Sequence, residues 1–142
     1  MDADLLEVGG DQLTGDHVTE TIESLSPLDR ERLVAVACTA GTTNLGIIDD
    51  LSGIGQAAKH YDIWMHVDGA YGAAGLAAPS VRDQFNGMEL ADSFIVDPHK
   101  WLFAPFDCCA LIYQSPALAR EAHQQQGAYL EVVYDGVWNS SD

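Results

Sequence analysis

Three short clusters of polar and small residues have the side chains to carry chemistry. They are residues 40–44 (AGTTN), 66–71 (HVDGAY) and 97–101 (DPHKW). Each cluster directly follows an apolar run that we predict to be a β-strand. In an open α/β sheet, ligands bind at the carboxyl ends of the strands, so we expect all three clusters to face one crevice.

Lys100 is the strongest single candidate for chemistry. It follows the apolar residues 94–96 and precedes the apolar residues 101–103, so we expect its stem to pack among apolar groups and its amine to be partly desolvated. Burial favours the neutral amine, which is the nucleophile that forms a Schiff base with a carbonyl compound. The alternative is a loop lysine whose amine extends to the surface.

Asp68 is the second candidate, because a carboxylate at the end of an apolar strand must be paired, hydrogen-bonded or functional. Next to the ring nitrogen of a bound aromatic cofactor, it would keep that nitrogen protonated and the ring electron-poor. Alternatively, Asp68 caps the turn that follows it. Gly69 and Ala70 are small enough to let a flat ring lie close to the backbone.

A metal site is a weaker hypothesis. His66 and Asp68 are two residues apart on a predicted strand and share a face, and His99 could approach them, but no tight ligand spacing is present. Histidines hydrogen-bonded inside the fold are the alternative. No glycine-rich phosphate fingerprint of the dinucleotide or Walker type occurs, and Gly41-Thr42-Thr43 is also a common turn composition.

The elements that must position these clusters follow from hydrophobic spacing. The apolar run 33–38 predicts a strand buried on both faces, and residues 51–61 and 63–67 predict a crossover helix and a second strand. This unit favours a mostly parallel sheet with right-handed crossovers. Because the connection from 96 to 108 is too short for a crossover helix, the last two strands are expected to be antiparallel. The remaining expected elements are helices at 14–25, 81–92 and 116–124 and strands at 93–96 and 108–113.

Length and composition limit the class of protein. The 142 residues suit one compact unit, 1–142, without an internal domain boundary, and the net charge of −16 makes nucleic acid and anionic membranes poor partners. No apolar run reaches the ~18 residues of a membrane span, and the acidic start lacks a basic leader, so we expect a cytoplasmic protein. Three cysteines cannot form a disulfide framework, and we expect reduced, buried thiols.

Taken together, the clusters resemble the group II pyridoxal-phosphate-dependent amino-acid decarboxylases, which include aromatic-amino-acid, glutamate, histidine and diaminobutyrate enzymes. The resemblance runs from about residue 13 to about residue 129, in the family's order and spacing. The tracts that carry it are Thr39–Thr43 with Gly46 and Asp49, His66–Gly72, Ala91–Phe94, Asp97–Trp101 and Phe106–Cys108.

The resemblance implies a role for each matching residue. Lys100 resembles the Schiff-base lysine, Asp68 the partner of the pyridine nitrogen and Ala70 the small residue against the ring. Thr43 resembles the hydroxyl that supports the cofactor-binding aspartate, and His99 the histidine beside the Schiff base and phosphate. Some members have Asn or Ser where this chain has Asp97. An ionised Asp cannot donate to phosphate, so we do not assign Asp97 to it.

By resemblance, the fold is part of the large domain of a fold-type-I enzyme that binds pyridoxal 5'-phosphate, with a mostly parallel sheet and flanking helices. The implied activity is that of a carboxy-lyase of amino-acid metabolism, which converts an L-amino acid to an amine and CO2 through a Lys100 Schiff base. Family members are several times longer and homodimeric, so we expect the isolated chain to be incomplete. The alternatives are a desulfurase or aminotransferase of the same fold, or a non-catalytic remnant.

Overall fold

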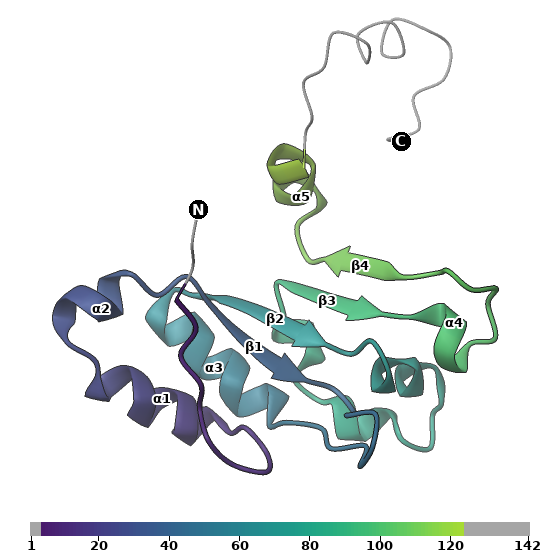
Figure 1. The fold of residues 1–142 in the computed structure, drawn as a ribbon, viewed down its shortest axis with the longest axis horizontal. Coiled ribbons are helices and arrows are strands. Elements are labelled where there is room, and N and C mark those ends of the chain that lie inside the picture. The colour runs from purple at the N-terminus through teal and green to yellow at the C-terminus, as the bar shows by residue number, and fades with distance from the viewer. Residues whose placement is uncertain (1–3, 124–142) are drawn as a thin grey trace, which may run out of the picture.

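The computed structural model describes residues 4–123, which form a four-stranded sheet with helices on one side (Figure 1). The strand order is β1-β2-β3-β4. The strands are β1 (Ala35–Thr39), β2 (Trp64–Asp68), β3 (Ser93–Val96) and β4 (Ala110–Tyr113). The first three strands run parallel and β4 runs antiparallel to β3, which confirms the predicted sheet.

Within residues 4–123, five α-helices connect or flank the strands: α1 (Gly15–Ser24), α2 (Pro27–Glu31), α3 (Leu51–Tyr61), α4 (Pro98–Trp101) and α5 (Pro116–His123). The crossover helix α3 begins and ends at the predicted residues, because Asp50 caps it and Asp62 ends it in the left-handed conformation. The Oδ1 atom of Asp50 accepts a hydrogen bond from the Gly53 amide at 3.0 Å, which satisfies a free amide of the first turn. Helix α1 also forms as predicted, with Thr14 as its cap.

The core lies between α3 and one face of the sheet. The register pairs Val36 with Met65 and Cys38 with Val67, and three of these four side chains are buried. On the opposite face of β1, Ala35 and Ala37 are exposed. The prediction that this strand is buried on both faces is therefore wrong, since α1 and α3 lie on the same side of the sheet (Figure 1).

The connection from β2 to β3 differs from the prediction. The expected helix at 81–92 is absent, and the structure has three short 3-10 turns instead, at Gly72–Ala77, Arg82–Phe85 and Met88–Leu90. Gly87 has a φ of +100°, and a Cβ there would lie 2.3 Å from the amide nitrogen of Ser52. A left-handed residue pressed against α3 interrupts any continuous helix at this point.

The three cysteines are free, but they are not equally buried. Cys38 is buried, Cys108 is half-buried and Cys109 is exposed, so the expectation of buried thiols is wrong for Cys109. Cys109 begins the approach to β4, whose Leu111 is also exposed, because no described element covers it there. Burial, reinforced by the nearby Asp49 carboxylate, raises the pKa of the Cys38 thiol to about 12.

We expect the native chain to alkylate more slowly at Cys38 than at Cys109, because Cys109 is exposed to the reagent even though its hydrogen bond to Asp97 also raises its pKa. A thiolate is the reacting species, and burial disfavours it at Cys38. Because its pKa is higher in the folded state, the protonated Cys38 thiol contributes to the free energy of unfolding. This contribution is complete below the unfolded pKa and is lost as pH rises toward about 12. Iodoacetamide labelling followed by peptide mass spectrometry, with a urea-unfolded sample as control, measures both rates. Equal native rates would contradict the buried position of Cys38.

Two further predictions concern the ends of the described region. The helix predicted to reach residue 124 is seen as α5 up to His123, and the weak pattern expected after Gly127 lies outside the described residues.

Within residues 4–123, no helix has the length and apolar character needed to cross a membrane.

Candidate functional site

The turns after β1, β2 and β3 meet at one edge of the sheet, as the sequence predicted. The amide of Ala40 donates to the carbonyl of Asp68 at 2.8 Å, and the amide of Asp97 donates to the carbonyl of Ala70 at 3.1 Å. These backbone bonds join the first turn to the second and the second to the third. The three clusters are therefore one continuous surface at the carboxyl ends of the strands. We call this surface, formed by residues 40–44, 66–71 and 97–101, the crevice edge.

Two glycines bring the first and second turns into direct contact. A Cβ on Gly72 would lie 2.4 Å from the carbonyl oxygen of Ala40 and 2.5 Å from the Cα of Gly41. Gly41 itself has a φ of +97°. Only residues without a side chain fit both positions, so the glycines set the spacing of the two turns.

Lys100 lies in the short helix α4, directly beyond β3. Its Nζ is 2.8 Å from Oδ2 of Asp97, and its side chain is 34% exposed. The amine of this partly exposed side chain is therefore held in an ion pair with a carboxylate, a contact that the sequence analysis did not predict. The cause is local: residues three apart in a helical turn lie on the same side, which brings Lys100 back over Asp97.

Asp97 is a nearly buried residue whose pairing with Lys100 the sequence reasoning missed. Its side chain is only 12% exposed. The hydrogen bond from Lys100, followed by the nearby Cys109 thiol, lowers the pKa of Asp97. Its Oδ1 atom is buried and meets no hydrogen-bond geometry within the described region. The spacing of an acid and a lysine across Pro98-His99 was the signal that could have revealed this pair.

Asp68 ends β2 and is exposed at the crevice edge. Its Oδ1 accepts a hydrogen bond from the amide of Ala70 at 3.0 Å, so the turn-capping alternative describes part of its role. No side-chain hydrogen bond to the second carboxylate oxygen, Oδ2, is present in residues 4–123. One oxygen thus fixes the carboxylate while the other is available to a ligand.

Ala70 and Thr43 lie on the same edge in different surroundings. Ala70 is half-buried in the turn after β2, whereas Thr43 is exposed in the turn after β1. Thr42, and not Thr43, shapes that turn by accepting a hydrogen bond from the amide of Ile47 at 3.0 Å. In the described part of the chain, no hydrogen bond joins Thr43 to Asp68, so its supporting role remains a prediction.

His99 faces the connection that leads to β4. Its Nδ1 lies 2.5 Å from the carbonyl oxygen of Cys108, and its ring meets that of Phe106 edge to face at a centroid distance of 5.1 Å. The amide of Cys108 also donates to Nδ1 at 3.1 Å, so both backbone groups of Cys108 contact this nitrogen, and the tautomer determines which of the two is hydrogen-bonded. These contacts fix the ring of His99, which precedes Lys100 in the chain. Contact of His99 with a cofactor remains a prediction.

His66 belongs to a small hydrogen-bonded cluster on the open face of the sheet. Its Nδ1 lies 2.8 Å from Oγ of Ser93, and the same oxygen accepts a hydrogen bond from Nε1 of Trp64 at 2.9 Å. Among residues 4–123, no group of three or more His, Cys, Asp or Glu side chains could hold a metal ion. The hydrogen-bonded alternative for His66 is therefore the one observed.

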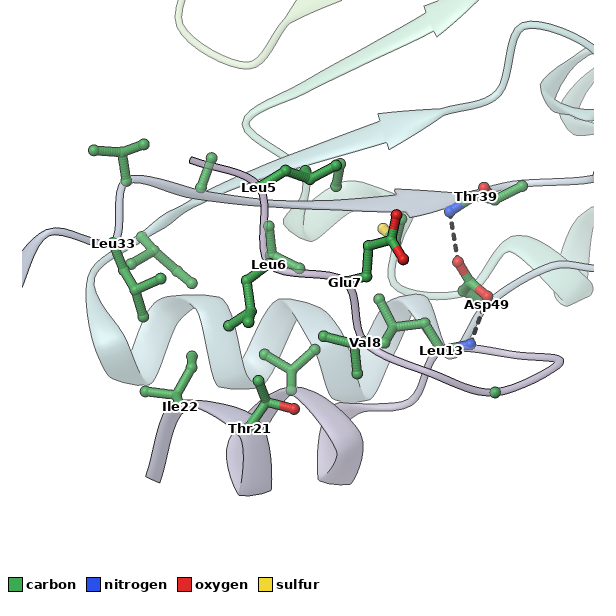
Figure 2. Close-up of a pocket in the computed structure, with 18 of the residues that line it drawn as sticks. Leu5, Leu6, Glu7, Val8, Leu13, Thr21, Ile22, Leu33, Thr39 and Asp49 are labelled. Carbon is green, nitrogen blue, oxygen red and sulfur yellow. Dashed lines mark hydrogen bonds between the residues drawn. The ribbon is translucent and has the colours of Figure 1, made fainter. Parts of the chain in front are cut away.

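Another groove lies along the free edge of β1. It has a volume of about 700 Å³ and separates β1 from the segment of residues 4–13 and from α1 (Figure 2). Asp49 closes one end by accepting hydrogen bonds from the amides of Thr39 and Leu13, at 2.6 and 2.8 Å. None of the predicted site residues lines this groove, so we assign the chemistry to the crevice edge and not to it.

Comparison with known proteins shows the family to which the chain belongs. Residues 8–139 match the family described as the pyridoxal-dependent decarboxylase conserved domain. The chain belongs to this family. It is 40% identical over 104 residues to 4-hydroxyphenylacetaldehyde synthase of Rhodiola rosea, covering 70% of this chain and 21% of that protein. It is 34% identical over 114 residues to the aromatic-L-amino-acid decarboxylase of Bacillus atrophaeus, covering 75% of this chain and 24% of that protein.

The fold agrees with solved structures of the family. Catharanthus roseus tryptophan decarboxylase in complex with L-tryptophan superposes with a TM-score of 0.70 at 29% identity, over 80% of this chain and 24% of that one. The predicted family resemblance and fold class are thereby confirmed. The pyridoxal-dependent decarboxylase chain described here spans only about a fifth to a quarter of the length of these relatives.

The crevice edge has side chains that suit two groups on the ring of pyridoxal phosphate. An amine on Lys100 and an available carboxylate oxygen on Asp68 suit the aldehyde and the ring nitrogen, and the small Ala70 leaves room for the ring. The three turns contain no arginine, so they do not provide the usual bidentate partner of the phosphate.

Proposed function

We propose that this chain carries the lysine and ring-facing part of the active site of a pyridoxal-phosphate-dependent L-amino-acid decarboxylase. The observation that carries the proposal is the bonded set of turns that brings Lys100 and Asp68 to one crevice edge. The match to the pyridoxal-dependent decarboxylase family supports the cofactor and the reaction class. Relatives named as aromatic-amino-acid and tryptophan decarboxylases support an aromatic L-amino acid as substrate.

Each residue has a distinct task in this proposal. When bound, pyridoxal phosphate supplies an electron-poor ring that accepts the electron pair released as CO2 leaves Cα. Lys100 provides the amine that attaches the cofactor and later carries protons. Asp68, held by its bond to the Ala70 amide, keeps the proton on the ring nitrogen. His99 offers Nε2 from a ring whose orientation its contacts with Cys108 fix.

The proposal requires groups that the described turns do not supply. Phosphate-binding groups and a cover for the opposite ring face must come from outside the described turns, and the net charge of −16 adds to the need for cationic groups. Positioning accounts for about 7–11 kcal/mol of the barrier in well-oriented reactions. Turnover is therefore expected of a longer protein or an assembly that contains this segment.

We expect borohydride reduction of the chain with excess pyridoxal phosphate to place the pyridoxyl group on Lys100. Lys59 is the internal comparison, because it lies exposed on α3, outside the crevice. Peptide mass spectrometry locates the label, and Lys100→Arg is the control that removes the reactive amine while keeping the charge. Preferential labelling of Lys59 would contradict the proposal.

A second outcome of the same chemistry is favoured by one relative, whose name is 4-hydroxyphenylacetaldehyde synthase. Both outcomes include loss of CO2, but the aldehyde also requires a two-electron oxidant, such as dioxygen, and water to release ammonia, so the residues above account only for the loss of CO2. Incubating a longer protein that contains this segment with L-tyrosine, L-tryptophan and L-glutamate, and measuring CO2, amine and aldehyde, separates a decarboxylase from an aldehyde synthase and tests the aromatic preference.

We also propose that the longer protein is a cytoplasmic homodimer that binds neither nucleic acid nor membranes. The acidic composition supports the last two points, since like charges repel. Phe103 and Phe106 are 95% and 84% exposed beside the crevice, and exposed aromatic side chains are typical of subunit interfaces.

A further inference from the structure

We infer that Asp97 is a positioning residue for Lys100, whose carboxylate holds the lysine amine at the crevice edge until a carbonyl ligand takes its place. The inference rests on the proposed function, in which the Lys100 amine attaches the cofactor. Its basis is the 2.8 Å contact between Nζ of Lys100 and Oδ2 of Asp97. This is the only ion pair of either residue within 4–123.

The carboxylate is the fixed member of the pair. The Asp97 amide donates to the carbonyl of Ala70 at 3.1 Å, and its carbonyl accepts from the amide of Lys100 at 3.0 Å. Its side chain is 12% exposed, whereas that of Lys100 is 34% exposed. The amine is therefore brought to a rigid acceptor, and a flexible lysine side chain loses its freedom in the process.

The surroundings keep this carboxylate ionised. It faces Lys100 and His99 from α4 and the thiol of Cys109 from the approach to β4, and the Lys100 hydrogen bond is the largest cause of its lowered pKa. A lowered pKa means that the pair is present above the unfolded pKa and is lost as pH falls through the folded pKa. At neutral pH the pair is intact.

The pair has a direct consequence for reactivity. A buried carboxylate without a partner is unfavourable, so the paired state of Asp97 and Lys100 is favoured over the separated one. An amine hydrogen-bonded to a carboxylate is less accessible to an electrophile than one in solvent. A ligand that reaches Lys100 must first separate the two groups, and Asp97 is then left to accept a hydrogen bond from another donor in the crevice.

The test uses the fact that the chain has two lysines, Lys59 and Lys100. Competitive acetylation with trace acetic anhydride, read by peptide mass spectrometry, gives the Lys100-to-Lys59 reactivity ratio without any cofactor. We expect Asp97→Asn to raise this ratio about 3- to 10-fold, because the variant loses the ion pair that restrains the amine, while partial exposure of the pair limits the effect. Asp83→Asn, which removes the same charge from the exposed turn at 82–85, is expected to leave the ratio unchanged. An equal change in both variants would overturn the inference.

A measurement on the unmodified chain removes the dependence on folding of a variant. Selective 15N labelling of lysine gives two side-chain signals, and we expect the Lys100 ammonium protons to exchange with water more slowly than those of Lys59. Circular dichroism identifies a variant that has unfolded, and Asp97→Ser serves as the second charge-free variant. Equal exchange of the two lysines in the unmodified chain would overturn the inference even if neither variant folds.

These results are independent of the test of the proposed function. A pyridoxyl label on Lys100 with an unchanged reactivity ratio would overturn the role of Asp97 and leave the proposed function standing. Slow exchange and a raised ratio, with the label absent from Lys100, would support the role of Asp97 and contradict the proposed function.

Discussion

In a longer protein that contains this segment, Asp68→Asn is expected to lower kcat about 10²- to 10³-fold, the effect typical of removing a group that stabilises charge in a transition state. The substitution isolates the charge. In the unmodified chain the Ala70 amide donates to Asp68 at 3.0 Å. An asparagine oxygen can accept the same bond, so the turn keeps its cap. The neutral amide, however, no longer stabilises a protonated ring nitrogen.

Steady-state turnover and absorbance of the bound cofactor measure the two consequences separately. We expect the variant to retain cofactor while losing turnover, because attachment depends on Lys100. Asp83→Asn serves as the matched control, since it removes one negative charge from an exposed 3-10 turn. Near-normal turnover of Asp68→Asn would show that Asp68 acts only as the cap of its turn.

Gly72→Ala is expected to lower the free energy of unfolding of this chain by about 3 kcal/mol, the upper part of the range for overpacked positions. The added Cβ would lie 2.4 Å from the carbonyl oxygen of Ala40 and 2.5 Å from the Cα of Gly41. Both atoms are backbone, so no rotamer change relieves the contact. Since domains are stable by only about 5–15 kcal/mol, the loss is large.

Urea denaturation followed by circular dichroism checks this expectation, with an unchanged m-value as the sign of a comparable transition. Gly9→Ala is the control, because a Cβ at Gly9 meets no atom within 4 Å and Gly9 does not have a positive φ. We expect a change within about 0.5 kcal/mol there. Similar midpoints for the two variants would mean that the turns after β1 and β2 adjust to the added methyl group.

The same contact links stability to the site. Gly41 belongs to the turn after β1, and Gly72 follows the turn that contains Asp68 and Ala70. Separating them shifts two of the three turns that form the crevice edge. A surviving Gly72→Ala protein is therefore expected to show weaker pyridoxyl labelling of Lys100 than Gly9→Ala under identical conditions.

The elements with a strong local signal could be predicted from the sequence. Helix α3 was predicted at its observed bounds, because the spacing of Ile54, Ala57 and Ala58 makes one apolar face and Asp50 provides the cap. The parallel strands and the antiparallel β4 followed from apolar runs and from the length of the connections. Each of these features depends on residues close together in the chain.

The connection at 72–90 could not be predicted in this way. Residues 81–92 have a spacing compatible with a helix, but Gly87 fits against the backbone of α3 at Ser52. That contact joins residues 35 positions apart, so no local pattern contains it. The open face of β1 has a similar explanation, since burial depends on which elements pack there and an apolar run alone does not specify them.

For the site, the sequence by itself determined which residues stand at the ends of three parallel strands, and so which side chains share the crevice edge. Strand direction and the alternation of apolar runs with polar turns suffice for that, because they are properties of local sequence. Only the tertiary structure decided that the carboxylate paired with Lys100 is nearly buried and that Cys109 is exposed. Burial depends on which elements pack against a residue, and that is fixed only once segments distant in the sequence have come together.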